Sequence, residues 1–281
     1  MNTTLYDQIG TGYVASRRAD PRIAEQILEA IAVATTVVNV GAGSGSYEPV
    51  DKRVVAVEPS ATMIRQRPRG GAPAVQATAE MLPFEADSFD CGLAVLTVHH
   101  WADPLAGLRE LRRVARKRVV VLTWDQNLWE RFWLVAEYLP ALALFDRRRA
   151  IPLELIISVL GSCEVRPVTV PYDCLDEFLG AYWRRPSAYL DATIRAVMLG
   201  FTQVPASDYD EGIRRLAVDL ENGNLAEKPS RPARGYDHRP WLSADRSRQE
   251  ATRIDSAEVT SYPPIPCGRS AHPELAPCSS S

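Results

Sequence analysis

Three glycines and one glutamate carry the chemistry that is most visible in this sequence. Gly41, Gly43 and Gly45 follow an apolar run, and Glu58 ends a second run of β-branched residues. Glycine lets the backbone bend sharply and approach a bound molecule closely, because no Cβ intervenes. A carboxylate at the end of the second run can accept hydrogen bonds from both hydroxyls of a ribose. These residues therefore predict a site for a ligand that contains a nucleoside.

The spacing of the glycines separates two kinds of nucleoside ligand. A dinucleotide fingerprint requires G-x-G-x-x-G directly before a helix, so that pyrophosphate meets the helix N-terminus. Here the pattern is G-x-G-x-G, and Ser46 occupies the position of the third dinucleotide glycine. Glu48 and Asp51 follow in a segment that starts a helix poorly, and their charges would repel a phosphate. The loop suits a nucleoside without phosphates better than NAD, and an NAD-type oxidoreductase is the disfavoured alternative.

Two histidines follow another apolar run, over residues 89–98. His99 and His100 stand beside the edge where the ligand is expected. Histidine is the side chain that most often transfers protons in catalysis near neutral pH. Either one could act as a general base, with His100 favoured because Trp101 follows it into the loop. The alternative is that one histidine packs against or caps the loop and the other faces solvent.

Alternating strand and helix patterns must position these groups. Runs rich in β-branched residues predict strands at 36–40, 53–57, 74–76, 89–98, 118–123 and 165–170, and helical spacing follows at 21–31, 61–66 and 104–114. This alternation predicts an α/β fold, a Rossmann-like doubly wound sheet that is mostly parallel and has helices on both faces. Ligands of such sheets bind outside the carboxyl ends of the strands, at the switch point. Gly41, Glu58 and His99 all fall on that edge.

A helical pattern with many large apolar residues continues over 127–160, and further helices are predicted within 173–221. We expect these segments to form a helical cap over the ligand edge. Four aromatic residues could line a pocket for a second reactant beneath it: Trp124, Trp129, Trp133 and Tyr138. Aromatic residues at helical spacing more often belong to the core, so both interpretations stay open. Arg147, Arg148 and Arg149 could meet an acidic substrate, but a solvated helix end is the favoured interpretation.

The composition changes beyond residue 225. Proline, serine and arginine become frequent there, and large aliphatic residues become rare. Such a low-complexity segment cannot bury enough apolar surface to offset the entropy lost on ordering. We therefore predict one domain over residues 1–225 and a disordered tail over 226–281. A chain truncated after Gly223 is then expected to keep nearly the same melting temperature.

Charge and cysteine usage exclude several classes of function. The formal net charge of -3 gives no long-range attraction to nucleic acid or to an anionic membrane. The five cysteines form no C-x-x-C pair, which argues against a metal site and indicates reduced thiols. The N-terminus has no export signal, and no apolar run reaches transmembrane length. We expect a cytoplasmic protein that binds no metal, nucleic acid or membrane; its oligomeric state stays open.

Three sequence blocks carry a family resemblance. They are residues 38–45 with the glycine loop, residues 55–60 with the acidic strand end and Met63 after it, and residues 77–84 followed by Ser88, Phe89 and Asp90. Together they resemble the class I S-adenosylmethionine-dependent methyltransferases, in the group similar to the ubiquinone/menaquinone-biosynthesis (type 11) enzymes. A glycine loop alone would be weak, whereas three blocks in order at this spacing are specific. The match is close over 6–125, looser over 126–221 and absent from the tail.

The resemblance implies that S-adenosyl-L-methionine is the cofactor and that a small-molecule acceptor receives its methyl group. In such families the glycine loop faces the methionine part, the acidic residue holds the ribose, and the third block lies near the adenine. An N-terminal segment closes over the cofactor's carboxylate. Carried over by position, the cofactor-binding residues are Asn39, Gly41, Gly43, Gly45, Glu58, Thr78, Ala79, Tyr13 and Arg17.

This sequence departs from the family pattern in three places. Asn39 and Thr78 stand where the family usually has acidic residues. Asn39 removes a negative charge near the cofactor's cationic groups, while the Thr78 hydroxyl can still bond the adenine amino group. The family's sheet also contains an antiparallel strand near the C-terminus, for which residues 257–262 are a poor candidate. A relic that keeps the fold without turnover is therefore a second alternative.

Overall fold

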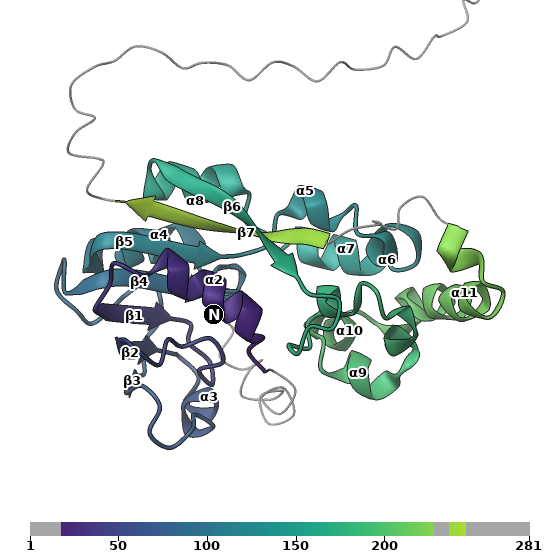
Figure 1. Ribbon diagram of the computed structural model, residues 1–281, viewed down its shortest axis with the longest axis horizontal. Helices are drawn as coiled ribbons and strands as arrows, with labels where there is room; N and C mark the ends of the chain where they lie inside the picture. Colours follow the sequence, from purple (N-terminus) through teal and green to yellow (C-terminus); the bar gives the residue numbers. More distant parts are fainter. Residues whose placement is uncertain (1–17, 228–235, 246–281) are drawn as a thin grey trace, which may run out of the picture.

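A seven-stranded sheet organises this chain (Figure 1). The structure is a computed structural model that describes residues 18–227 and 236–245. In sheet order, the strands are β3 (Ala74–Val75), β2 (Arg53–Val57), β1 (Thr36–Val40), β4 (Phe89–Val95), β5 (Ala115–Leu122), β7 (Tyr236–Asp245) and β6 (Cys163–Val170). The first five of these pair in parallel, which confirms the predicted α/β fold with a mostly parallel sheet.

The direction of winding reverses at β1. The chain adds β2 and β3 on one side of β1 and then adds β4 and β5 on the other side. The loops that leave the carboxyl ends of β1 and β4 therefore diverge, and a crevice opens between them. Gly41 follows β1, Glu58 follows β2, and His100 lies shortly after β4. The topology thus brings the three predicted ligand-binding segments to one edge.

Helices cover both faces of the sheet (Figure 1). The helices of this sheet domain are α2 (Pro21–Ala30), α3 (Ala61–Arg65), α4 (Pro104–Val114) and α8 (Leu153–Leu160). Residues that alternate along β5 separate into two cores: Val120 belongs to a cluster with Ile27 of α2, and Val121 to a cluster with Leu111 of α4. The sheet is therefore buried on both sides, as its nearly continuous apolar strands predict.

A lobe of short helices lies beside the sheet (Figure 1). This helical lobe consists of α5 (Gln126–Trp129), α6 (Trp133–Glu137), α7 (Pro140–Arg147), α9 (Ala192–Ala196), α10 (Leu199–Gln203), α11 (Asp210–Glu221) and the 3-10 turns η2 (Leu179–Tyr182), η3 (Pro186–Leu190), η4 (Ala206–Asp208) and η5 (Asn224–Glu227). The cap predicted over 127–160 needs a correction at its end. Ile156 and Leu160 of α8 pack in the cluster that contains Leu111 of α4, so α8 belongs to the sheet domain.

The tail prediction is also corrected by the structure. β7 lies inside the predicted tail, between β5 and β6, and is antiparallel to both. Its pairing runs from Arg118 opposite Asp245 to Leu122 opposite Trp241 on one side. The antiparallel strand that the family resemblance implies is therefore present, and β6 has its partner. The low content of aliphatic residues predicted a tail here. A strand between two others is also stabilised by backbone hydrogen bonds on both edges, which the residue composition does not reveal. Residues 257–262 lie outside the described residues.

Smaller differences concern the ends of elements. β4 ends at Val95 instead of 98, because Leu96 adopts a φ of 54° and the chain turns into η1 (Val98–His100). β5 begins at Ala115 instead of 118, directly after α4. At the start of 173–221, where helices were predicted, residues 179–182 form only the 3-10 turn η2. Within residues 18–227 and 236–245, no helix has the length and apolar character needed to cross a bilayer.

Candidate functional site

The glycine loop has a backbone that only glycine adopts without strain. Gly41, Gly43 and Gly45 have φ values of 70°, 54° and 94°. The constraint is strongest at Gly41, where an added Cβ would lie 1.9 Å from Oγ1 of Thr97. The Gly41 amide donates to the Val57 carbonyl at 2.8 Å, which ties the start of the loop to β2. The loop is therefore held tightly between the ends of β2 and β4.

The Glu58 carboxylate fixes the next part of this loop. Its Oε2 accepts from the Gly43 amide at 2.9 Å, and its Oε1 accepts from the Ser60 amide at 3.0 Å. Glu58 is only 3% exposed. A carboxylate offers about four lone-pair sites, so it can accept hydrogen bonds from several donors at once. Glu58 can thus position the loop and accept hydroxyl donors from a ligand at the same time.

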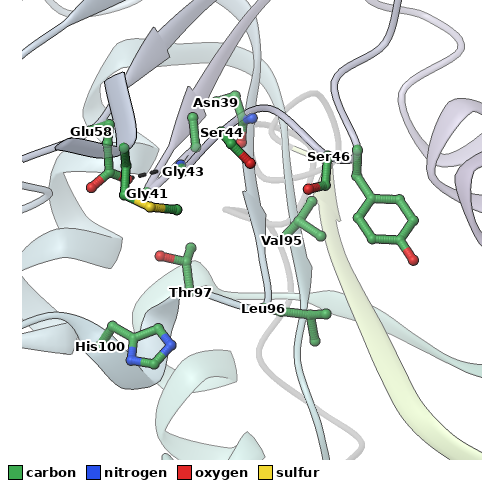
Figure 2. A pocket seen from close by; sticks show the side chains of 13 residues that line it. Asn39, Gly41, Gly43, Ser44, Ser46, Glu58, Val95, Leu96, Thr97 and His100 are labelled. Atoms are coloured by element: carbon green, nitrogen blue, oxygen red, sulfur yellow. Dashed lines mark hydrogen bonds between the residues drawn. The ribbon is translucent and has the colours of Figure 1, made fainter. Parts of the chain in front are cut away.

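These residues surround a cavity of about 700 Å³ at the carboxyl edge of the sheet, which we call the loop cavity (Figure 2). It is lined by Asn39, Gly41, Ala42, Gly43, Ser44, Ser46, Tyr47, Glu58, Met63, Val95, Leu96, Thr97 and His100. Five of the predicted site residues are in that set: Asn39, Gly41, Gly43, Glu58 and His100. The structure therefore brings together the strand-end residues that the sequence singled out.

Thr97 is a cavity residue that sequence reasoning missed. It lies between the glycine loop and His100 in Figure 2. Its Oγ1 is buried and has no hydrogen-bond partner among the described residues. A buried hydroxyl without a partner is costly, so this group is suited to bonding a ligand. Its place just after a central strand was the sequence signal that could have identified it.

Asn39 has an acidic neighbour that the sequence pattern did not reveal. Its Nδ2 donates to Oε1 of Glu48 at 3.2 Å, and Oε2 of Glu48 pairs with Arg67 at 2.5 Å. Arg67 also donates to the Gly43 carbonyl at 3.1 Å. The charge that Asn39 lacks is thus supplied next to it by Glu48, although Arg67 neutralises much of it. The network fixes the far side of the glycine loop.

Four predicted residues lie outside the lining of the loop cavity: Gly45, Thr78, Ala79 and His99. Ala79 is buried in the core cluster that contains Trp101. The Thr78 hydroxyl bonds the Glu80 carboxylate, whose pKa is lowered because hydrogen bonds, including those from backbone amides, outweigh the effect of burial. Tyr13 and Arg17 lie outside the described residues.

A second, larger cavity of about 940 Å³ adjoins the first, and we call it the lobe cavity. Leu96 and His100 line both cavities. The other lining residues are His99, Trp124, Trp129, Leu142, Asp146, Arg149, Val170, Glu177, Phe178, Leu179, Gly180, Val197, Met198, Leu199, Gly200 and Phe201. Of the four aromatic residues proposed for a pocket, Trp124 and Trp129 line it, whereas Trp133 and Tyr138 are buried in the core. The lobe cavity is therefore mainly apolar and opens beside the loop cavity.

Polar contacts gather where the lobe meets the sheet edge. Nη2 of Arg149 lies 2.6 Å from Nδ1 of His100, and the His99 and His100 rings are 3.7 Å apart. Asp146 accepts a hydrogen bond from Nε1 of Trp129 at 2.8 Å. Burial raises the pKa of Asp146 to about 6, although the Trp129 hydrogen bond and the Arg149 charge act in the opposite direction.

The arginines at 147–149 thus divide into two roles. Arg147 is exposed and pairs with Glu130, and Arg148 is also exposed, as the solvated interpretation predicts. Arg149 instead lines the lobe cavity and contacts His100. Sequence reasoning missed the roles of Asp146 and Arg149, because no local pattern distinguishes them from a charged helix end.

Polar contacts connect the glycine loop with the segment just before Glu177 and Phe178, which line the lobe cavity. The Tyr47 hydroxyl, next to the glycine loop, donates to Oδ2 of Asp176 at 3.0 Å. Asp20, the N-cap of α2, accepts from the Leu175 amide at 3.0 Å. Hydrogen bonds from Arg22 lower the pKa of Asp20 to about 2. These contacts fasten the segment before Glu177 and Phe178 to the loop cavity.

Among the residues that the structure describes, no group of three or more His, Cys, Asp or Glu side chains could hold a metal ion.

Comparisons with known proteins agree with this geometry. Residues 38–123 match a family model described as a methyltransferase domain. The structure is similar to that of a protein of Anabaena variabilis, which is named as a methyltransferase from an antibiotic biosynthesis pathway. The two are 28% identical with a TM-score of 0.74, over 82% of this chain and 98% of that one.

A second structural neighbour is more distant. An S-adenosylmethionine-dependent methyltransferase of Thermotoga maritima is 21% identical, over 60% of this chain and 83% of that one, with a TM-score of 0.44. No curated protein matches the chain. The region matched by the family model, residues 38–123, contains the glycine loop, Glu58 and both histidines.

Proposed function

The chain belongs to the class I S-adenosylmethionine-dependent methyltransferases, in the type 11 group, and from this premise we propose that its methyl acceptor is a small molecule bound in the lobe cavity. One observation carries the proposal: Leu96 and His100 line both cavities. Methyl transfer requires the two reactants to meet in line at one point. Two adjoining cavities with a shared wall provide such a point.

The residues of the loop cavity fit the cofactor. The Glu58 carboxylate can accept hydrogen bonds from ribose hydroxyls, and a Cβ added at Gly41 would overlap the side chain of Thr97, which lines this cavity. The buried Thr97 hydroxyl offers one more hydrogen bond. S-adenosylmethionine supplies a methyl group already activated on a sulfonium, so the protein mainly binds, orients and excludes water. Roles for Asn39, Gly45, Thr78, Ala79, Tyr13 and Arg17 in binding it remain proposals carried over from the family pattern.

A general base at His99 or His100 also remains a proposal. His100 lies at the junction of the two cavities. The His99 ring lies beside it, with its centroid 4.1 Å from a ring centroid of Trp124. Arginine has only donors, so the bond from Arg149 occupies Nδ1 of His100 as an acceptor. His100 could accept a proton there only after Arg149 moves. A cytoplasmic location likewise remains a proposal, which the cysteine usage supports.

The proposed function is tested by two experiments. First, calorimetric titration with S-adenosylhomocysteine should give binding that a Glu58→Ala variant loses, while NAD should give none. Second, the full chain is incubated with methyl-labelled cofactor and a metabolite extract, and labelled products are separated by size. Label in a small molecule supports the proposal. Label found only in protein or nucleic acid would refute a small-molecule acceptor.

A further inference from the structure

Two charged residues of the lobe cavity come from the end of α7 and the residues just after it. Arg149 contacts His100, which also lines the loop cavity, and Asp146 precedes Arg149 by three residues at the end of α7. Much of the remaining lining is apolar, including Leu142, Met198 and Phe201. An occupant of such a cavity would have a largely apolar body and one polar group directed at the junction of the two cavities, where His100 lies.

The Arg149 guanidinium is fixed on two sides. It lies 5.2 Å from the Phe145 ring centroid and donates to Nδ1 of His100. An imidazole with an unprotonated Nδ1 is neutral when Nε2 carries the remaining hydrogen. The junction therefore presents hydrogen-bond donors and one fixed positive charge from Arg149. A group that is to lie there must be able to accept hydrogen bonds.

Asp146 adds the complementary property. It is an acceptor in the same cavity, and its Oδ2 already accepts from Trp129. Its raised pKa of about 6 means that the carboxylate is ionised at neutral pH yet can be protonated at modest cost. Donors at Arg149 and an acceptor at Asp146 together match a group that both accepts and donates a hydrogen bond.

Charge narrows the choice of this group. A carboxylate acceptor would add negative charge to a cavity that already holds Asp146 and Glu177 against the single arginine in its lining. An ammonium group at the junction would lie against Arg149 and would have no lone pair for the methyl group. A hydroxyl is neutral, accepts from Arg149 and donates to Asp146. A phenol or enol is favoured among hydroxyls, because the guanidinium stabilises the oxyanion as it forms.

We propose that the acceptor is a largely apolar molecule whose methylated group is an acidic hydroxyl, held between Arg149 and Asp146. This rests on the proposed function, since it assumes that the acceptor occupies the lobe cavity. In the transfer, the hydroxyl oxygen bonds to the methyl carbon and the carbon–sulfur bond breaks with its electron pair going to sulfur. The hydroxyl proton passes to the Asp146 carboxylate. Arg149 determines specificity, and Asp146 accepts the proton in place of His99 or His100.

The test uses one apolar skeleton with different polar groups. Binding of 2-naphthol, naphthalene, 2-naphthylamine and 2-naphthoate to the full chain with S-adenosylhomocysteine is measured by calorimetry. The hydrogen bond from the charged Arg149 to the hydroxyl oxygen predicts that 2-naphthol binds about tenfold to hundredfold more tightly than naphthalene, which has no acceptor atom. Arg149→Gln should remove this preference. The matched variant Arg148→Gln, at an exposed neighbour, should keep it. S-adenosylhomocysteine binding by each variant verifies folding.

The outcomes separate this inference from the proposed function. Tighter binding of the amine or the carboxylate overturns the inference, as does an unchanged naphthol preference in Arg149→Gln or no binding by any compound. None of these outcomes affects the extract labelling, which judges the small-molecule acceptor separately. If 2-naphthol is methylated, Asp146→Asn should bind it within a few fold of wild type but transfer the methyl group about 100-fold more slowly or less. Equal transfer rates would eliminate Asp146 as the proton acceptor.

Discussion

The sheet domain and the helical lobe contribute one cavity each, but they build it in different ways. The loop cavity is defined by backbone, through positive φ values, strand ends and main-chain amides on Glu58. The lobe cavity is defined by side chains from short helices. A backbone-defined site accepts one ligand shape, whereas a side-chain-defined site can change by substitution without rebuilding the fold. This difference agrees with a common cofactor on one side and a particular acceptor on the other.

The two regions also differ in what stabilises them. In the sheet domain, Asp20, Ser60 and Asp103 cap helices with their side chains. In the lobe, Asp125 and Asp191 cap α5 and α9, but the other four helices begin without a side-chain cap: α6, α7, α10 and α11. In the sheet domain, α8 also lacks one. Packing around Trp133 also stabilises the lobe. The ring centroids of Tyr138 and Tyr189 each lie 6.1 Å from that of Trp133. Short helices of this kind depend on tertiary contacts for their stability.

The largest expected effect concerns the strand that completes the sheet domain. A chain ending at Glu227 lacks β7 and leaves the facing edges of β5 and β6 without hydrogen-bond partners. We expect it to lose cooperative unfolding, because the whole stability of a domain is only about 5–15 kcal/mol. Thermal melts followed by circular dichroism measure this. A chain ending at residue 250 is the control, and it should melt like the full chain. Equal melting of the chain that ends at Glu227 would show that β7 is dispensable.

The next effect tests whether the loop cavity depends on bare backbone. Gly41→Ala combines a left-handed φ with a Cβ overlapping Thr97, which together should cost about 2–4 kcal/mol of unfolding free energy. S-adenosylhomocysteine binding should be lost with it. Gly70→Ala is the matched control, since its φ is 84° but nothing lies near the added Cβ. It should cost only about 1 kcal/mol in urea unfolding. Similar costs for both variants would mean that the space beside Thr97 is unimportant.

The same contrast explains which parts of the structure the sequence could predict. The sheet, its winding and the residues Gly41, Gly43 and Glu58 follow from local signals: apolar runs, glycine spacing and an acid at a strand end. Asp146 and Arg149 have no such signal, because their role depends on contacts made in the folded chain, such as that of Arg149 with the distant His100. β7 was missed for a related reason. Its segment has few aliphatic residues, and its strand character comes from pairing with β5 and β6, which are far away in sequence.

A smaller effect sharpens the role of Glu58. Glu58→Gln keeps the shape of the side chain but turns an amide NH₂ toward either the Gly43 or the Ser60 amide. Losing a charged acceptor predicts S-adenosylhomocysteine binding weaker by about tenfold to hundredfold. Calorimetry measures it, and Glu85→Gln at an exposed position is the control. If Glu58→Gln binds as tightly as wild type, the carboxylate holds only the loop and not the ligand.

The smallest expected effect tests whether burial of the Asp146 carboxyl group in the lobe lowers the free energy of unfolding. The pKa of Asp146 rises from 3.8 to about 6 on folding, so the folded state keeps a proton that the unfolded chain releases. Folding stability therefore falls as the pH rises from about 4 to 6 and stays reduced above that. At 1.36 kcal/mol per pKa unit, the cost would be about 3 kcal/mol, which partial exposure to the cavity reduces to about 1–2 kcal/mol.

Asp146→Asn should then be more stable than wild type at pH 7.5 by that amount in urea unfolding, and equal to it near pH 4. Asp208→Asn, at an exposed position, should show no difference at either pH. The groups that share the cavity with Asp146 are Arg149, Glu177, His99 and His100, so the comparison is made at constant ionic strength. A loss of stability in Asp146→Asn at pH 7.5 would mean that the ionised carboxylate supports the lobe, and the contrast between the two regions would then have to rest on capping and packing alone.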